Sequence, residues 1–214
     1  MSKKGRIALL TVFIILLIDQ VLKIWIKTNM VIGQEYKILG NWFIIHFTEN
    51  PGMAFGMEFW GEHGKLVLSL FRIVAISAIG WFIARLIKDN VSTTLVICMS
   101  MIFAGAMGNI IDSAIYGLVF NESFFQVAQF MPEGGGYASF LHGKVVDMLY
   151  FPIIRGQYPD WSFLGSKANS AFIFFRPVFN IADSAITMGV IWLILFQKQF
   201  FNEIDKVFKK KVLD

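Results

Sequence analysis

Residues 7–26 read IALLTVFIILLIDQVLKIWI, an apolar run of twenty residues whose only charged members are Asp19 and Lys23. A helix needs about 20 mostly apolar residues to cross a lipid bilayer. Three basic residues precede the run, but it is too long for a signal peptide and lacks a small-residue cleavage site. We therefore expect a membrane-spanning helix that carries a carboxylate and an ammonium four residues apart on one face.

The composition of the whole chain is typical of a protein embedded in a lipid membrane. Its 214 residues are 56% hydrophobic and 16% charged, and the mean hydropathy is +0.62. Soluble domains average roughly 45–50% apolar and about 25% charged residues. These values exclude a disordered chain, a nucleic-acid-binding tail and an ordinary cytosolic enzyme, and the single cysteine, Cys98, excludes a disulfide scaffold. The expected surroundings are membrane lipid, with no nucleic-acid partner.

Three further stretches are long and apolar enough to cross a bilayer. They are residues 66–87, 95–116 and 178–196. The predicted fold is an α-helical integral membrane protein with four transmembrane helices, built as a single domain over residues 1–214. Two loops, 28–64 and 117–177, connect the spans on one side.

Positive charges near the ends of the spans predict the orientation, because cytoplasmic loops are enriched in Lys and Arg. The basic residues lie before the first span, between the second and third spans, and after the fourth: Lys3, Lys4, Arg6, Arg85, Lys88, Lys198, Lys206, Lys209, Lys210 and Lys211. Loop 28–64 holds only Lys37 against four glutamates. Both termini are therefore expected in the cytoplasm and both large loops outside.

The outer loops have features of local structure. Residues 35–60 contain β-branched and aromatic runs around a Gly40-Asn41 turn, which predicts short strands. Loop 117–177 holds two apolar patches, 124–131 and 172–175, which are too short to span and are suited to the membrane interface.

Two carboxylates at membrane depth indicate function, because an ionisable group is costly there. Asp112 lies near the outer end of the third span and Asp183 near the outer start of the fourth. Each follows an asparagine by three residues, Asn109 and Asn180, so an amide and a carboxylate are expected on one helix face. Asp19 is predicted at the same level, and Asp147 lies in an apolar stretch that can fold back over it.

Paired carboxylates in a partly dry site cannot both ionise cheaply. One keeps a proton and acts as an acid while the other acts as a base on water, as in aspartic proteases. Such chemistry needs no metal and no cofactor, and none is expected. Spacing leaves open which aspartate is the partner of Asp183.

Other functions compete with this interpretation. The same polar residues can hold helices together without chemistry, as in a membrane assembly protein, or bind a cation at Asp112 and Asp183 in a small carrier. The three histidines are too scattered for a metal site. Ser139 and Lys144 are a weak candidate for a Ser/Lys peptidase pair.

Five sequence blocks, in order along nearly the whole chain, resemble lipoprotein signal peptidase, also called signal peptidase II. They are DQVLK (19–23), ENPGMAFG (49–56), GAMGNIID (105–112), VVD (145–147) and FNIADS (179–184).

The resemblance implies an intramembrane aspartic endopeptidase of the bacterial inner membrane, with a small outer β-cradle and an active site near the outer face. Its substrate is a prolipoprotein whose cysteine carries a diacylglyceryl group, and cleavage comes just before that cysteine. A globomycin-type inhibitor is expected. The family pattern places the catalytic pair on Asp147 and Asp183. The supporting positions fall on Asp19, Lys23, Asn50, Gly52, Asn109, Asp112, Asn180 and Ala182.

The chain departs from the family pattern in two respects. Ser113 stands where the family often has an arginine after the aspartate of the third span, and Lys144 or Arg176 is the expected replacement. Insertions are expected at about 118–141 and 155–175.

Overall fold

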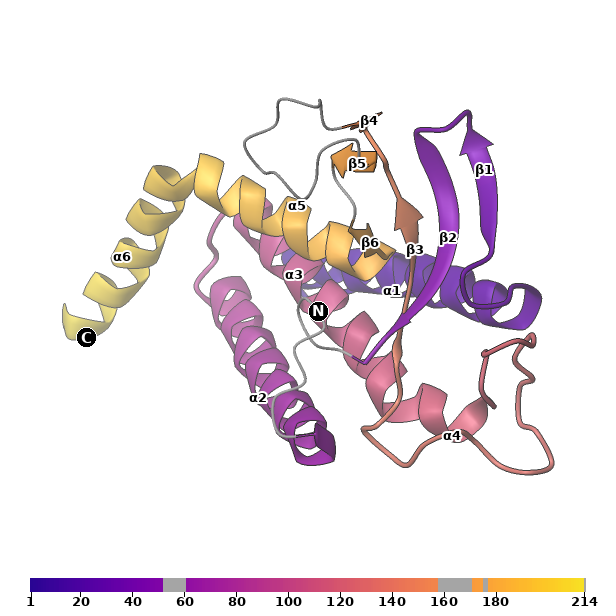
Figure 1. Ribbon diagram of the computed structural model, residues 1–214. Helices are drawn as coiled ribbons and strands as arrows, with labels where there is room; N and C mark the ends of the chain where they lie inside the picture. Colours follow the sequence, from indigo (N-terminus) through magenta and orange to yellow (C-terminus); the bar gives the residue numbers. More distant parts are fainter. Residues whose placement is uncertain (52–60, 158–170, 175–176, 214) are drawn as a thin grey trace.

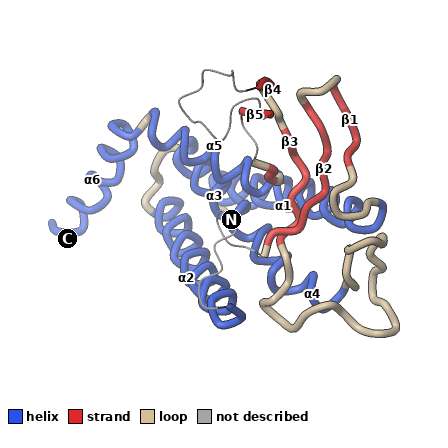
Figure 2. The backbone as a smooth tube through the Cα atoms, in the orientation of Figure 1, coloured by secondary structure: helices blue, strands red, loops and turns tan. Residues whose placement is uncertain are grey.

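The computed structural model describes residues 1–51, 61–157, 171–174 and 177–213. Long helices form one part of the molecule, and the strands lie beside them (Figure 1). Figure 2 shows the longer strands, in red, lying together on one side of the blue helices.

The helices account for most of the chain. They are α1 (Lys3–Asn29), α2 (Gly61–Lys88), α3 (Thr93–Ile111), α4 (Gly117–Val119), α5 (Ile181–Leu195) and α6 (Gln197–Leu213), with a π-helical turn, η2 (Asp112–Tyr116), joining α3 to α4. Among the described residues, three helical stretches are long and apolar enough to cross a membrane, in α1, in α2 and from α3 through α4. A fourth span results if α5 and α6, which are bent by 78° from one another, are counted together.

The predicted bounds of the fourth span, 178–196, are wrong at their start. Asn180 is the N-cap of α5, and the two residues before it form a strand, so the helix begins at Ile181. An N-cap side chain satisfies backbone N–H groups of the first turn, which fixes where a helix starts. The fifteen residues of α5 rise about 22 Å, less than the roughly 30 Å of a bilayer core.

The strands form two sheets. The first has the order β1-β2-β3-β6, and all its neighbouring strands are antiparallel. The second pairs β4 with β5. The bounds are β1 (Glu35–Leu39), β2 (Phe43–Asn50), β3 (Val145–Tyr150), β4 (Ile154–Gln157), β5 (Ala171–Phe174) and β6 (Val178–Phe179).

The predicted strands of the first loop are confirmed where the loop is described. β1 and β2 flank Gly40, which has a φ of +54° and therefore suits the tight turn between them. Residues 52–60 lie outside the described part of the chain. In the second loop, β5 occupies residues of the patch 172–175, while 124–131 forms an irregular segment with Phe125 and Met131 strongly exposed.

Helix α3 is the centre of the helical part, and it packs against α1, α2 and α5. It begins at the N-cap Ser92, whose hydroxyl accepts a hydrogen bond from the backbone of Leu95. Glycines let α5 approach closely. A Cβ atom on Gly105 would lie 2.2 Å from the carbonyl oxygen of Ala182, so only glycine fits this contact.

We predict that Gly105→Ala lowers the free energy of unfolding by about 3 kcal/mol, because the added methyl group pushes α5 away from α3. The measurement is thermal unfolding in detergent micelles. Gly134→Ala is the matched control, since a Cβ atom there meets nothing within 4 Å. Equal stability of the two variants would contradict the tight α3–α5 contact.

Candidate active site

The buried ammonium of Lys23 lies at the centre of the polar residues inside the helices. Its Nζ atom is 2.9 Å from Oδ2 of Asp19, 2.8 Å from Oδ2 of Asp112 and 3.1 Å from Oδ1 of Asn109. The side chains of Lys23 and both aspartates are fully buried. An ammonium has three N–H donors, and each finds an acceptor here. Lys23 therefore joins α1 to α3 and η2.

Asp19 extends this network to α5. Its Oδ1 atom accepts a hydrogen bond of 2.9 Å from the backbone N–H of Ala182. Gly108 lies beside the same carboxylate, and a Cβ atom there would be 2.8 Å from Oδ2 of Asp19. The carboxylate thus satisfies an N–H group in the first turn of α5 that has no acceptor within its own helix.

Asp112 brings strand β3 onto the helices. Its Oδ2 atom accepts a hydrogen bond of 3.2 Å from the backbone N–H of Val146, and its Oδ1 atom accepts one of 3.0 Å from Gln20. Gly143, just before β3, passes so close that a Cβ atom would lie 2.2 Å from the carbonyl oxygen of Asp112. The π-helical turn at Asp112 and this glycine together fix the start of β3 over the network.

Asn180 connects Asp147 and Asp183. Its Nδ2 atom donates to Oδ1 of Asp147 at 2.8 Å, and its Oδ1 atom accepts from the backbone N–H of Asp183 at 2.8 Å. The carboxylate of Asp183 accepts from the backbone of Asn180 at 3.4 Å and from Nδ2 of Asn109 at 2.8 Å. Asn50 donates to the other oxygen of Asp147 at 3.4 Å. The side-chain amides of Asn50, Asn109 and Asn180 therefore hold the two carboxyl groups.

The sequence pattern of Asn180 and Asp183 has a different meaning from the one expected. The two residues do not share a face of one helix, since Asn180 precedes α5 and forms a reciprocal capping box with Asp183. A polar N-cap followed by an acidic residue three positions later is a signature of helix starts. That signal was present in the sequence. Asn109, by contrast, lies within α3, with Asp112 at its end.

Burial changes the acidity of Asp147, which is 4% exposed on strand β3. Removal from water, together with the negative charge of Asp183, raises the pKa of Asp147 from 3.8 to about 7. The positive charge of Lys23 and the hydrogen bonds from Asn50 and Asn180 oppose this shift without cancelling it. Near neutral pH the carboxyl group of Asp147 is therefore able to hold a proton and to release it.

This arrangement is suited to acid–base chemistry on a water molecule or a substrate carbonyl. Among the described residues, no group of three or more His, Cys, Asp or Glu is placed to hold a metal ion. Ser139 hydrogen-bonds His142 at 3.0 Å, and Lys144 pairs with Glu122 at 2.9 Å, so the structure does not bring Ser139 and Lys144 together as a peptidase pair.

The structure brings together most of the residues that the sequence predicts for the site. Those that belong to the one connected network are Asp19, Lys23, Asn50, Asn109, Asp112, Asp147, Asn180, Ala182 and Asp183. Gly52 and Arg176 lie outside the described residues. The expectation that Lys144 pairs with Asp112 is wrong, because Lys144 contacts glutamates and Asp112 already has Lys23 as its cation.

Sequence reasoning missed two charged residues next to this network. Lys27 is fully buried one helical turn beyond Lys23, and it pairs with Glu49, the residue before Asn50. The four-residue spacing of the two lysines was a usable signal, because residues four apart lie on the same helix face.

A family profile described as signal peptidase (SPase) II matches residues 11–201. The chain belongs to the signal peptidase II family. The resemblance inferred from the five sequence blocks is thereby confirmed, and membership indicates that this chain is a protease.

Relatives within the family are similar over most of their length. The lipoprotein signal peptidase of Porphyromonas gingivalis is 48% identical over 193 residues, which cover 90% of this chain and 83% of the relative. That of Amoebophilus asiaticus is 41% identical over 192 residues, covering 88% and 75%. A bacterial membrane enzyme solved by the in meso method at 1.9 Å resolution is 26% identical, with a TM-score of 0.56 and coverage of 88% of this chain and 90% of that chain.

We predict that Lys23→Met lowers the free energy of unfolding of this family member by about 3–5 kcal/mol, because the buried carboxylates of Asp19 and Asp112 lose their cation. The measurement is thermal or denaturant unfolding in micelles. Lys88→Met, at an exposed position near the end of α2, is the control and should change stability by less than about 0.5 kcal/mol. A Lys23 variant as stable as the control would refute the central role of this ammonium.

Proposed function

We propose that the protein is an aspartic endopeptidase of the bacterial inner membrane that removes signal peptides from diacylglyceryl-modified prolipoproteins. The cut falls just before the lipidated cysteine, and Asp147 and Asp183 are the catalytic pair. The observation that carries the proposal is that one residue, Asn180, bonds both carboxyl groups: its side-chain Nδ2 donates to Asp147 and its backbone N–H donates to Asp183. It does so inside a chain that belongs to the signal peptidase II family.

The chemistry follows from one proton shared by the pair. Asp147 has the raised pKa and supplies the proton, while Asp183 accepts a proton from a water molecule. The oxygen of that water attacks the peptide carbonyl, whose oxygen receives the proton of Asp147. The C–N bond then breaks as the proton gained by Asp183 passes to the leaving amine, and the hydroxyl proton returns to Asp147. Water is consumed, and both carboxyl groups regain their starting states.

The surroundings of the pair suit a peptide that is anchored in lipid. The pair lies where β3 and the start of α5 meet α3 (Figure 1). The outward sides of the spans carry exposed apolar residues, among them Phe13, Phe71 and Trp81. The diacylglyceryl chains are therefore able to stay in the bilayer while the backbone before the cysteine reaches the pair. Both termini are proposed to be cytoplasmic and the sheet to lie on the outer side.

The decisive experiment is a cleavage assay in detergent with a diacylglyceryl-modified prolipoprotein and its unmodified form. We expect cleavage of the lipidated form only. Asp147→Asn and Asp183→Asn should each lower the rate by about 10³-fold or more, since each removes a proton acceptor or donor at the reacting atoms. Both variants should keep their secondary structure and their size in gel filtration.

Other outcomes separate the alternatives. Folded wild-type protein that leaves both substrates intact would overturn the proposed function. pH-linked uptake of a cation into vesicles would favour a carrier, and loss of folding in both variants, with no cleavage by the wild type, would favour an assembly protein.

The pH dependence of cleavage gives a second test. Asp147 is protonated below its pKa of about 7 and loses its proton as the pH rises through that value. The proton donor is lost in that step, so the rate should fall above about pH 7, with an apparent pKa that belongs to the pair. A rate that stays level to pH 9 would show that Asp147 is not the acid.

A further inference from the structure

A second buried charge pair lies beneath the sheet, and the mechanism above does not use it. Lys27 on α1 pairs with Oε1 of Glu49 on β2, and their side chains are 0% and 2% exposed. The hydroxyl of Ser123 is 3.0 Å from both the ammonium and this carboxylate oxygen. A charge so far from water is stable only when it is paired and hydrogen-bonded. Lys27, Glu49 and Ser123 therefore form one hydrogen-bonded unit.

This unit lies on the opposite face of the sheet from the catalytic carboxyl group. Side chains alternate between the two faces of a strand, so Glu49 and Asn50 point to opposite sides of β2. Asn50 reaches Asp147, whereas Glu49 reaches back towards α1. Around it lies an apolar core that includes Phe47, Phe120, Val146 and Met148. The Lys27 ammonium also lies 5.2 Å from the ring centroid of Phe120.

The Lys27–Glu49 pair holds β2 at the point where its register against β3 determines whether Asn50 faces Asp147. Glu49 is opposite Val146 and Asn50 is opposite Val145 in the β2–β3 ladder. The ladder is irregular between Ile45 and Thr48, just before this point. Sliding one strand by a single residue would move every side chain to the other face. Anchoring Glu49 to α1 prevents that slip beside Asp147.

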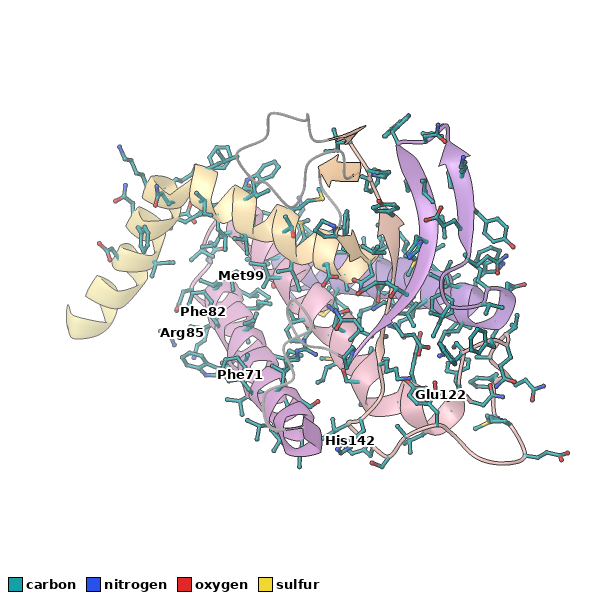
Figure 3. All side chains as sticks on the ribbon, in the orientation of Figure 1. Phe71, Phe82, Arg85, Met99, Glu122 and His142 are labelled. Atoms are coloured by element: carbon teal, nitrogen blue, oxygen red, sulfur yellow. The ribbon has the colours of Figure 1, made fainter. Side chains whose placement is uncertain are left out.

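The loop between α4 and β3 closes this unit from outside. Lys144, the residue before β3, lies 3.5 Å from Oε2 of Glu49 and 2.9 Å from Glu122. Its backbone N–H donates to the hydroxyl of Tyr137 at 2.7 Å, and that ring also lies 5.1 Å from the Lys27 ammonium. Figure 3 shows Glu122 on this loop, on the far side of the molecule from Arg85 of α2.

We propose that Lys27 and Glu49 are positioning residues for peptide cleavage, which fix β2 against β3 so that Asn50 orients the carboxyl group of Asp147. The inserted loop supplies Ser123, Tyr137 and Glu122 to enclose the pair. Lys23 and Lys27 lie one turn apart on α1, and each is linked to a different one of the two carboxyl groups. Lys23 reaches Asp183 through Asn109, and Lys27 reaches Asp147 through Glu49 and Asn50. This inference rests on the proposed function.

The test compares three variants of the Lys27–Glu49 pair with wild type. Lys27→Met combined with Glu49→Gln removes both charges together, so that neither is left buried alone. Glu49→Asp keeps the charge but shortens the side chain by one methylene, which draws β2 out of place. A third variant, Lys27→Arg, preserves the cation. The matched control is Arg85→Met combined with Asp89→Asn, which removes an ion pair of 2.6 Å at the end of α2, remote from the site.

The readouts are kcat, KM and the pH dependence of cleavage of the lipidated prolipoprotein. For the double variant and Glu49→Asp we expect kcat to fall about tenfold to a hundredfold with KM changed less than about threefold, because a misplaced group slows chemistry more than binding. The fall in rate on the alkaline side should move to higher pH. Asn50 no longer stabilises the ionised form of Asp147, while Asp183, Lys23 and Asn180 still face it. Lys27→Arg and the control should remain within about threefold of wild type.

The outcomes separate the two proposals. An active wild type, with kcat and the alkaline limb unchanged in Glu49→Asp, overturns the positioning role and leaves the proposed function standing. The positioning role is also overturned if kcat falls while the alkaline limb of the pH profile stays in place, because a general loss of rigidity in the protein would give that result. A wild type that fails to cleave overturns the proposed function and the positioning role with it. If the double variant does not fold, Glu49→Asp alone decides.

Discussion

The structure depends on one constraint, which is that the Lys23 ammonium is fully buried inside the helices and must be neutralised there. Two aspartates and an asparagine do so, and each brings a different part of the chain with it. The carboxylate of Asp19 also holds the first turn of α5, and that of Asp112 holds the start of β3. Since water cannot replace any of these partners, the elements that carry Asp147 and Asp183 are fixed to the same centre.

The full positive charge of Lys23 and the proposed catalytic pair, Asp147 and Asp183, are kept apart. The cation sits beside the supporting aspartates, Asp19 and Asp112, and reaches Asp183 only through the amide of Asn109. A lysine placed directly against Asp147 would lower the pKa of that carboxyl group and remove its proton near neutral pH. Amides instead hold Asp147, because they orient a carboxyl group without adding a full charge, whereas Asp183 also interacts electrostatically with Arg72 of α2. The pKa of Asp147 is raised by its burial and by the negative charge of Asp183, and the amide hydrogen bonds oppose this rise without cancelling it.

Ser113, the residue after Asp112, fits the same scheme. Asp112 has all its described partners in Lys23, Gln20 and the backbone of Val146, so it does not need a second cation. Ser113 instead bonds the carbonyl oxygen of Asn109 one turn back. The loop after α4 leads to Lys144, just before β3, and this lysine meets Glu49 and Glu122.

The sequence by itself determined the membrane character, the helical spans of α1, α2 and α3, the strands β1 and β2, and the membership of the family. These follow from local composition and from short motifs, which need no knowledge of distant contacts. Only the tertiary structure decided that Lys144 faces Glu122 and that Lys27 is buried against Glu49. The partners in these two pairs are 22 residues apart in the chain, and nothing in their local sequence specifies which opposite charge each meets. A buried charge is shielded from water, so it pairs with whichever opposite charge the folded chain places beside it.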